Sequence, residues 1–226
     1  MAEQHDTTRA KGISGPDAGF GRLWRKIYRV ELTGVALEPA AIVAEWKREF
    51  SRLWPGDNRF FAPITGLREG EVAEIQLAMP GGISLSTGVR LLYSTDLAFS
   101  LMAPPGHIFS GWTTFSSYRD GETTVGQVEV LMRASDPAFE IGLELFGHRH
   151  EDQFWRGVLA NLARHLGVEA EPTQCSVCVD RRFLVRNATN LRFNSVLRHG
   201  LHLSSVPIQR LFPRRGSDIE QKGAAS

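Results

Sequence analysis

Cysteine is nearly absent from this 226-residue sequence, and so are long apolar stretches. The two cysteines, Cys175 and Cys178, exclude a small scaffold stabilised by several disulfides. No segment reaches the roughly 20 apolar residues of a membrane-spanning helix. Residues 1–21 are polar and glycine-rich and lack the apolar core of a signal peptide. We therefore expect a cytoplasmic protein in which residues 1–24 form a disordered tail.

Acidic residues are also missing from one part of the chain. Residues 181–215 contain eight arginines and no Asp or Glu, although the whole chain has a formal net charge of +1. Subtracting these eight charges leaves −7 on the other residues, so the two parts differ in their chemistry. The overall composition, 42% hydrophobic with 13 Phe and 5 Trp, is sufficient for one packed domain with extensions.

The pattern of apolar residues predicts a strand and a helix near the start of this domain. Residues 25–35 alternate between polar and apolar side chains, which is typical of a strand. Pro39 then opens a helix, because proline is tolerated in a first turn. Apolar residues follow at three- and four-residue steps along one helical face: Val43, Trp46, Phe50 and Leu53.

A series of strands is predicted next, at residues 72–79, 83–93, 97–103, 107–118 and 123–133. The turns between them are short and rich in proline and glycine, and Asp120-Gly121 is a strong hairpin signal. Such short connections predict antiparallel neighbours. Glycines within the strands, at Gly88, Gly111 and Gly126, indicate a sheet with bulges or bends.

The period then changes to that of a helix. Ser135-Asp136-Pro137 is a helix start, and residues 138–146 are a candidate short helix. A longer helix is predicted from Glu151 to its glycine cap at Gly167. Its apolar face, which includes Phe154, Val158, Leu162 and Leu166, needs a surface to pack on, and the sheet provides one. We therefore predict an α+β fold with a cavity between a curved antiparallel sheet and a long C-terminal helix.

Two segments, PPGHIFSGWTTFSSYRDGETTVGQVEVLMRASDP and FWRGVLANLARHLGV, resemble the SRPBCC or START-like superfamily, which includes polyketide cyclases and the birch pollen allergen type. The resemblance covers about residues 26–168. It implies a helix-grip domain over residues 25–168, with six to seven strands on a long helix, and a hydrophobic ligand. It implies no catalytic signature, because the superfamily shares none.

Two groups of residues are candidates for contact with such a ligand. His107 and Trp112 lie near a predicted loop, where they would orient a polar group of the ligand or serve as a loop histidine and a core tryptophan. Glu129 and Arg133 share one strand face. If that face lines the cavity, Glu129 is a candidate acid or base and Arg133 a candidate carboxylate ligand.

The simpler interpretation of Glu129 and Arg133 is that their face is in water while the valines of the same strand face inward. Arg90 and Tyr93, on an earlier strand, leave the same two alternatives open.

Two clusters contain possible metal ligands. The HRHED sequence at residues 148–152 is better explained as a solvated helix start, where acidic side chains complement the helix dipole. Cys175 and Cys178 form a CxxC pair, and His199 and His202 an HxxH pair, which together would suit tetrahedral zinc. Their spacing departs from that of zinc fingers, so we favour thiols without a metal and expect no cofactor.

Residues 169–215 are predicted to form a basic amphipathic helical extension, followed by a disordered end at 216–226. The extension has three alternative roles: packing on the domain, which we favour, contact with an anionic membrane, and, least favoured, nucleic-acid binding. The candidate membrane-contact residues are its arginines, Arg181, Arg182, Arg186, Arg192 and Arg198.

We expect the protein to bind a hydrophobic small molecule or lipid in the cavity, as a carrier that acts near a membrane surface. The alternatives are an enzyme of the polyketide cyclase or dehydratase type and an interaction protein without a ligand. Two or more polar side chains in an otherwise apolar cavity, including a His, Asp, Glu or Tyr, would favour the enzyme.

Overall fold

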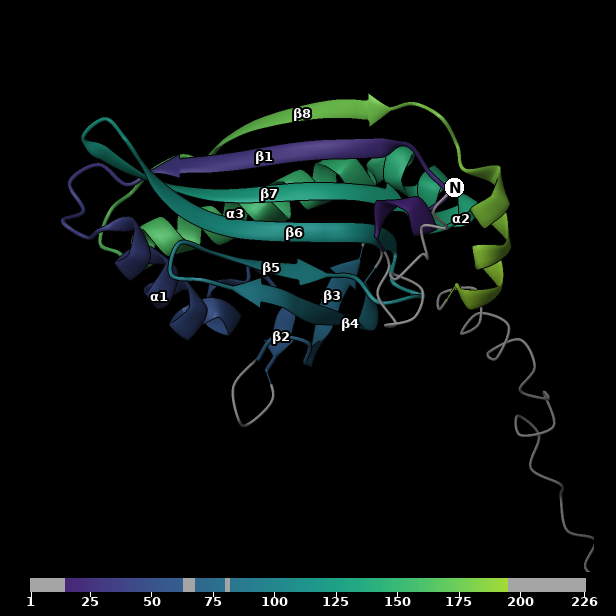
Figure 1. Ribbon diagram of the computed structural model, residues 1–226, viewed down its shortest axis with the longest axis horizontal. Helices are drawn as coiled ribbons and strands as arrows, with labels where there is room; N and C mark the ends of the chain where they lie inside the picture. The colour runs from purple at the N-terminus through teal and green to yellow at the C-terminus, as the bar shows by residue number, and fades with distance from the viewer. Residues whose placement is uncertain (1–14, 63–67, 80–81, 195–226) are drawn as a thin grey trace, which may run out of the picture. The chain divides into compact units, whose positions relative to one another are not determined.

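One eight-stranded antiparallel sheet organises the part of the chain that the structure describes, residues 15–62, 68–79 and 82–194 of a computed structural model (Figure 1). Its strand order is β2-β3-β4-β5-β6-β7-β1-β8, so the sheet is open, with β2 and β8 at its edges. The strands are β1 (Leu23–Glu31), β2 (Arg59–Phe61), β3 (Val72–Met79), β4 (Ile83–Ser94), β5 (Ala98–Met102), β6 (Phe109–Asp120), β7 (Thr123–Ala134) and β8 (Thr173–Asp180).

Two helical segments cover one face of the sheet. The first is α1 (Pro39–Glu49), which continues into a 3₁₀ turn, η3 (Phe50–Leu53). The second runs without a break through α2 (Pro137–Gly142), a π-helical turn, η4 (Leu143–Gly147), and α3 (His148–His165). Asp136 caps this second segment, because its carboxylate accepts hydrogen bonds from the N–H groups of Ala138 and Phe139.

The hydrophobic core lies between this face and the helices. From α1, Trp46 packs edge-on against Phe115 of β6 at 5.5 Å between ring centroids. Phe50 packs in the same way against Phe99 and Phe115. Such edge-to-face pairs add to the stabilisation from burial alone. From α3, the buried residues are Val158, Leu159, Leu162 and Ala163.

The predicted α+β class, the curved antiparallel sheet and the long C-terminal helix are confirmed. The sheet has eight strands rather than six or seven, because β2 and β8 were not predicted as strands. Segment β8 lies within the predicted helical extension, so that prediction is wrong for Thr173–Asp180. Six of its eight residues are exposed, and this removes the alternation between apolar and polar positions that identifies a strand. Pairing of its backbone with β1 holds it in the sheet.

The segments that flank the sheet pack against one another at the end where β7 leads into α2. Phe20 and Gly21 donate backbone hydrogen bonds to the carbonyl oxygen of Ala134, at 2.8 and 3.1 Å. The ring of Phe20 stacks on that of Phe183, with centroids 5.4 Å apart. Residues 15–24, which we expected in a disordered tail, therefore belong to the folded unit.

The residues that follow β8 also belong to this unit. They form a short 3₁₀ helix, η5 (Val185–Phe193), in place of a long amphipathic helix. Asn187 holds it in place by donating to the carbonyl oxygens of Asp17 and Gly19. The expectations for residues 1–14, and those for the extension and the C-terminus from residue 195 onward, lie outside the described residues.

Gly111 marks an irregular point in β6. Its φ angle is 149°, and a β-carbon there would lie 2.0 Å from the carbonyl oxygen of Leu131. Gly142, on α2, has ordinary helical angles and open space around it. The two positions therefore differ in how they would accept a methyl group.

We expect Gly111→Ala to lower the free energy of unfolding by at least about 2 kcal/mol, because the backbone of β6 or β7 must shift to relieve the clash. Gly142→Ala, the matched control, should leave stability unchanged or raise it by about 0.4–1 kcal/mol. Urea unfolding followed by circular dichroism measures both. Equal stability of the two variants would contradict the constraint at Gly111.

Candidate functional site

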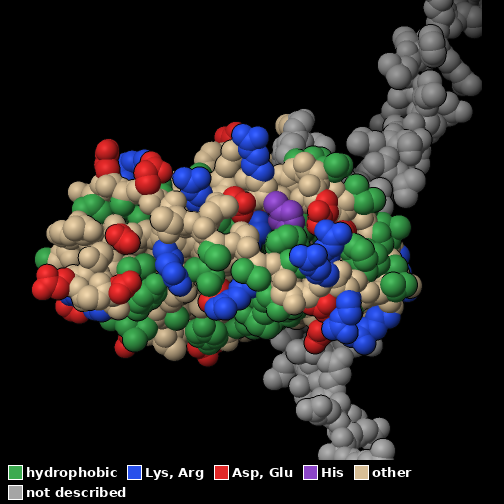
Figure 2. Space-filling view, turned by 90° about the horizontal axis from the view of Figure 1, so that it is seen from above, with side chains coloured by type: hydrophobic (Ala, Val, Ile, Leu, Met, Phe, Trp, Pro, Cys, Tyr) green, Lys and Arg blue, Asp and Glu red, His purple; other side chains and the backbone are tan. Residues whose placement is uncertain are grey.

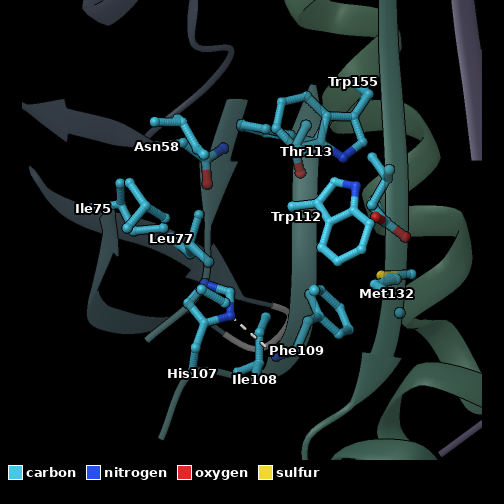
Figure 3. A pocket seen from close by; sticks show the side chains of 18 of the residues that line it. Asn58, Ile75, Leu77, His107, Ile108, Phe109, Trp112, Thr113, Met132 and Trp155 are labelled. Carbon is cyan, nitrogen blue, oxygen red and sulfur yellow. Dashed lines mark hydrogen bonds between the residues drawn. The ribbon is translucent and has the colours of Figure 1, made fainter. Parts of the chain in front are cut away.

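A cavity of about 150 Å³ lies between the sheet and α3 (Figure 3). Strands β3 to β7 supply one wall, with residues such as Ile75, Leu77, Leu101 and Val130. Residues from α3 and from the segment after η3 complete it. Six aromatic side chains dominate the lining: Trp54, Phe109, Trp112, Phe115, Phe154 and Trp155. Its polar residues are Asn58, His107, Thr113, His150 and Glu151.

His107 presents an unused hydrogen-bond donor. It lies just before β6, is 8% exposed, and accepts a hydrogen bond from the N–H of Phe109 through Nδ1 at 3.0 Å (Figure 3). This bond requires the tautomer that carries its proton on Nε2. Within the described residues, Nε2 has no hydrogen-bond partner. Burial lowers the pKa of His107 to about 4, so the ring is neutral at pH 7.

Glu151, in the first turn of α3, is the only Asp or Glu among the described residues that line the cavity. Its Oε2 lies 2.9 Å from Nζ of Lys26, a β1 side chain that is 1% exposed. Burial raises the pKa of Glu151, and the positive charge of Lys26 opposes that shift. The site thus contains a buried carboxyl group that borders an apolar space.

The neighbouring Asp152 is in a different environment. Its Oδ1 accepts hydrogen bonds from Nζ of Lys26 at 2.8 Å and from the hydroxyl group of Tyr28 at 2.6 Å. Burial works to raise the pKa of Asp152, but these hydrogen bonds outweigh it and the pKa is lowered. Burial and the carboxylates of Glu151 and Asp152 raise the pKa of Tyr28, so its hydroxyl group remains protonated as the donor.

Two other polar residues of the lining are held by the backbone. His150 makes a hydrogen bond through Nε2 to the carbonyl oxygen of Ala78, at 2.9 Å. Asn58 donates to the carbonyl oxygen of Pro55 and accepts from the N–H of Ala78. Both therefore join β3 to the elements around the cavity.

The structure places two of the six candidate ligand-contact residues, His107 and Trp112, at the cavity. Arg90 and Tyr93 of β4 are not among its lining residues, and Tyr93 is exposed. Glu129 accepts a hydrogen bond from Arg25 at 2.7 Å, on the opposite face of the sheet. That arrangement corresponds to the simpler of the two alternatives for this strand face.

Arg133 lies on the same face as Glu129 but is buried beneath the flanking segments. It donates to the carbonyl oxygens of Gly21 and Arg182 and to the carboxylate of Asp180, at 2.6 to 2.9 Å. Arg133 thus joins β7 to both segments, and this structural use accounts for its burial.

Sequence reasoning missed Glu151, His150 and Lys26. The HRHED sequence was interpreted as a solvated helix start, whereas Glu151 is buried against the sheet. A signal for Lys26 was present, because it lies two residues before Tyr28 and four before Val30 on the inward face of β1. A lysine at such a position requires buried acidic partners.

The metal and tail candidates are only partly within the described residues. Cys175 is exposed and Cys178 half-buried on β8, and their three-residue separation places them on opposite strand faces. His199, His202 and Arg198 lie outside the described residues. Among residues that are described, no group of three or more His, Cys, Asp or Glu is arranged to hold a metal ion. None of the described helices combines the length and apolar character needed to cross a membrane.

No family model matches the chain, and no curated protein matches it in sequence. Solved structures do resemble it. The di-domain ARO/CYC StfQ from the steffimycin biosynthetic pathway aligns with a TM-score of 0.50 at 13% identity, over 73% of this chain and 53% of that chain. Protein Ms6760 from Mycobacterium smegmatis aligns with a TM-score of 0.45 at 10% identity, over 64% of this chain and 90% of that chain. Ara h 8.0201 aligns with a TM-score of 0.44 at 10% identity, over 64% of this chain and 97% of that chain.

The likeness to StfQ, together with the sheet and long helix described above, shows that the chain has a helix-grip fold. The chain spans about half the length of StfQ. At this identity the likeness concerns the fold alone.

The neutral state of His107 makes stability depend on pH. Its pKa is about 4 when folded against an ordinary value of 6.5, so between these values the unfolded chain binds a proton that the folded chain does not. The free energy of unfolding should therefore fall as the pH drops from 6.5 towards 4. His148, whose pKa is lowered to about 4 by burial and by Lys26, contributes in the same range.

Between pH 7 and pH 4.5 the free energy of unfolding should fall in the wild type. In His107→Phe we expect this fall to be smaller by about 2–3 kcal/mol. Urea unfolding at the two pH values measures this difference. His165→Gln, at an exposed position at the end of α3, is the control and should keep the wild-type dependence. If His107→Phe loses as much stability between the two pH values as the wild type does, His107 is not held neutral.

Proposed function

We propose that the protein binds a small, largely apolar molecule with a planar ring in the cavity between the sheet and α3. The observation that carries this proposal is the lining of six aromatic side chains around a space of about 150 Å³. Apolar cavities of roughly this size bind benzene-sized molecules. Aromatic walls offer stacking and edge-to-face contacts to a ring as well as apolar burial.

The size of the cavity favours a ring over a long lipid chain. A polycyclic molecule or an acyl chain would need α3 or the lining side chains to move, whereas one or two fused rings need little rearrangement. StfQ, which shares the fold, is named as an ARO/CYC of a biosynthetic pathway, and such a role is consistent with a cavity for a small ring compound.

We expect Ala103→Phe to abolish binding of indane, a bicyclic hydrocarbon, because Ala103 is buried in the cavity wall and a phenyl group there would occupy the space. Trp54, Trp112 and Trp155 line the cavity, so tryptophan fluorescence excited at long wavelength reports binding. Ala98→Phe, at the start of β5 and not among the lining residues, should bind indane as the wild type does. Unchanged binding by Ala103→Phe would contradict the assignment.

A role near an anionic membrane is supported by the surface at the α2 end of the sheet. Ile141, Leu145 and Phe146 are at least half exposed there, and Leu145 reaches 73%. The segment after β8 adds exposed Val185 and Phe183. Figure 2 shows apolar side chains next to Lys or Arg side chains at this end of the molecule.

Basic residues accompany this surface. Arg181, Arg182, Arg186 and Arg192 are exposed, although Arg182 is paired with Asp180 at 3.0 Å. Apolar side chains that enter the interface beside arginines that meet anionic headgroups are the usual means of peripheral attachment.

We expect the full-length protein to co-sediment with phosphatidylserine-containing vesicles, and Leu145→Glu to reduce the bound fraction several-fold, because it adds a negative charge and removes an exposed apolar group. Leu97→Glu, at an exposed apolar site between β4 and β5, should bind as the wild type does. Equal loss in both variants, or no binding by the wild type, would remove the membrane role.

A further inference from the structure

Two ionisable side chains on the cavity wall keep hydrogen-bonding capacity that the protein does not use. His107 and Glu151 both line the cavity, and each is 8% exposed. His150 and Asn58, by contrast, are bonded to backbone groups that hold β3 in place. The cavity is therefore apolar except for a few polar groups, of which one histidine and one carboxyl group remain available to a ligand.

The two groups approach the cavity from different elements. His107 belongs to the segment between β5 and β6, and Glu151 to the first turn of α3. Figure 3 shows the ring of His107 held by its bond to Phe109, with its other nitrogen turned toward Leu77, another residue of the lining. A space of about 150 Å³ is close to the size of a single ring compound, so one such ligand would fill most of the cavity that both side chains line.

His107 has the properties of a neutral hydrogen-bond donor. Nδ1 accepts from the backbone, so the ring cannot turn or change tautomer without losing that bond. Its Nε2–H is thus directed and lacks a partner within the described residues. A neutral imidazole in this state suits an oxygen atom that becomes negatively charged during a reaction.

Glu151 has the properties of a proton acceptor that is held in place. Lys26 contacts Oε2 and Trp155 donates a side-chain hydrogen bond to the same carboxylate, whose remaining lone pairs are left for a ligand. Lys26 and Tyr28 also bind Asp152, which keeps that neighbour ionised. The pKa of Glu151 is raised and that of Asp152 lowered, a separation that is typical of carboxyl pairs with distinct roles.

We infer that this cavity catalyses enolisation of a small ring-bearing ketone, with Glu151 as the base and the Nε2–H of His107 as the donor to the carbonyl oxygen. The inference rests on the proposed binding of a ring compound. Glu151 takes the proton from the carbon next to the carbonyl group. The electron pair of that C–H bond forms a carbon–carbon double bond, and the carbonyl π electrons move to oxygen, where the negative charge meets His107.

Return of the proton completes the cycle. Glu151, now protonated, delivers it to the same carbon or to a conjugated one, so the net reaction is proton exchange or isomerisation. No oxidant, reductant or other reactant is required. Two or more polar side chains in an apolar cavity, including a His, Asp, Glu or Tyr, are the feature that we expected to favour an enzyme. His107 and Glu151 provide that feature.

The test uses 2-indanone as the ketone and indane as its analogue without a carbonyl group. Exchange of the α-protons of 2-indanone in D₂O is followed by NMR, and binding of indane by tryptophan fluorescence. The full-length wild type should accelerate exchange over buffer. Glu151→Gln should reduce the acceleration on the order of 100-fold while indane still binds. His107→Phe should reduce it roughly 10-fold or more, since it removes only the oxyanion donor.

Glu144→Gln is the matched control. Glu144 lies seven residues, about two helical turns, before Glu151. It pairs with Arg22 at 2.8 Å on the surface and is not among the lining residues of the cavity. This variant should exchange 2-indanone as fast as the wild type. If Glu151→Gln does not fold, the comparison of His107→Phe with Glu144→Gln decides in its place.

The outcomes separate this inference from the proposed function. Indane binding without accelerated exchange by the wild type would overturn the enolisation and leave the binding function standing. Exchange by folded Glu151→Gln at the wild-type rate would also overturn it. Failure of the wild type to bind either compound would overturn the binding function, and the inference with it.

Discussion

The contact between Lys26 and two consecutive carboxylates fixes where the long helix meets the sheet. Lys26 is a buried cation on β1, and Glu151 and Asp152 reach it from the N-terminal end of α3. A buried charge without a partner costs several kcal/mol, so each of these groups requires the others. The sheet and α3 are therefore tied at this point, and the cavity opens beside it, because Glu151 faces both Lys26 and the apolar lining.

The arrangement explains why the cavity exists at all. C-terminal to Glu151, α3 buries Val158, Leu159, Leu162 and Ala163 against the sheet. Trp46 of α1 and Phe50 of η3 fill another part of the same face. The space lined by aromatic rings lies against the N-terminal half of α3, which contributes Phe154 and Trp155. Large rings meeting at steep angles do not fill a curved surface completely, and the volume that remains is the candidate ligand site.

A second set of contacts stabilises the end of the sheet where β7 leads into α2. Arg133, buried on the outer face, holds the segment before β1 and the segment after β8 through Gly21, Arg182 and Asp180. Without Arg133, each of these segments would lose the hydrogen bonding that this side chain provides. Together they add an edge strand and a cap to the helix-grip fold, and they place exposed apolar and basic residues next to α2.

The amino-acid sequence by itself determined the elements whose local signals are strong: the antiparallel hairpin at Asp120-Gly121, the apolar stripe of α3, and the α+β class. It also identified His107 and Trp112 as candidates. Local patterns did not reveal β8, because an exposed edge strand has no apolar alternation, nor the burial of Glu151, because HRHED is equally suited to a solvated helix start. Only the tertiary structure brought Lys26 to Glu151 across 125 residues and left His107 Nε2 without a partner, since both depend on which surfaces meet when distant segments pack.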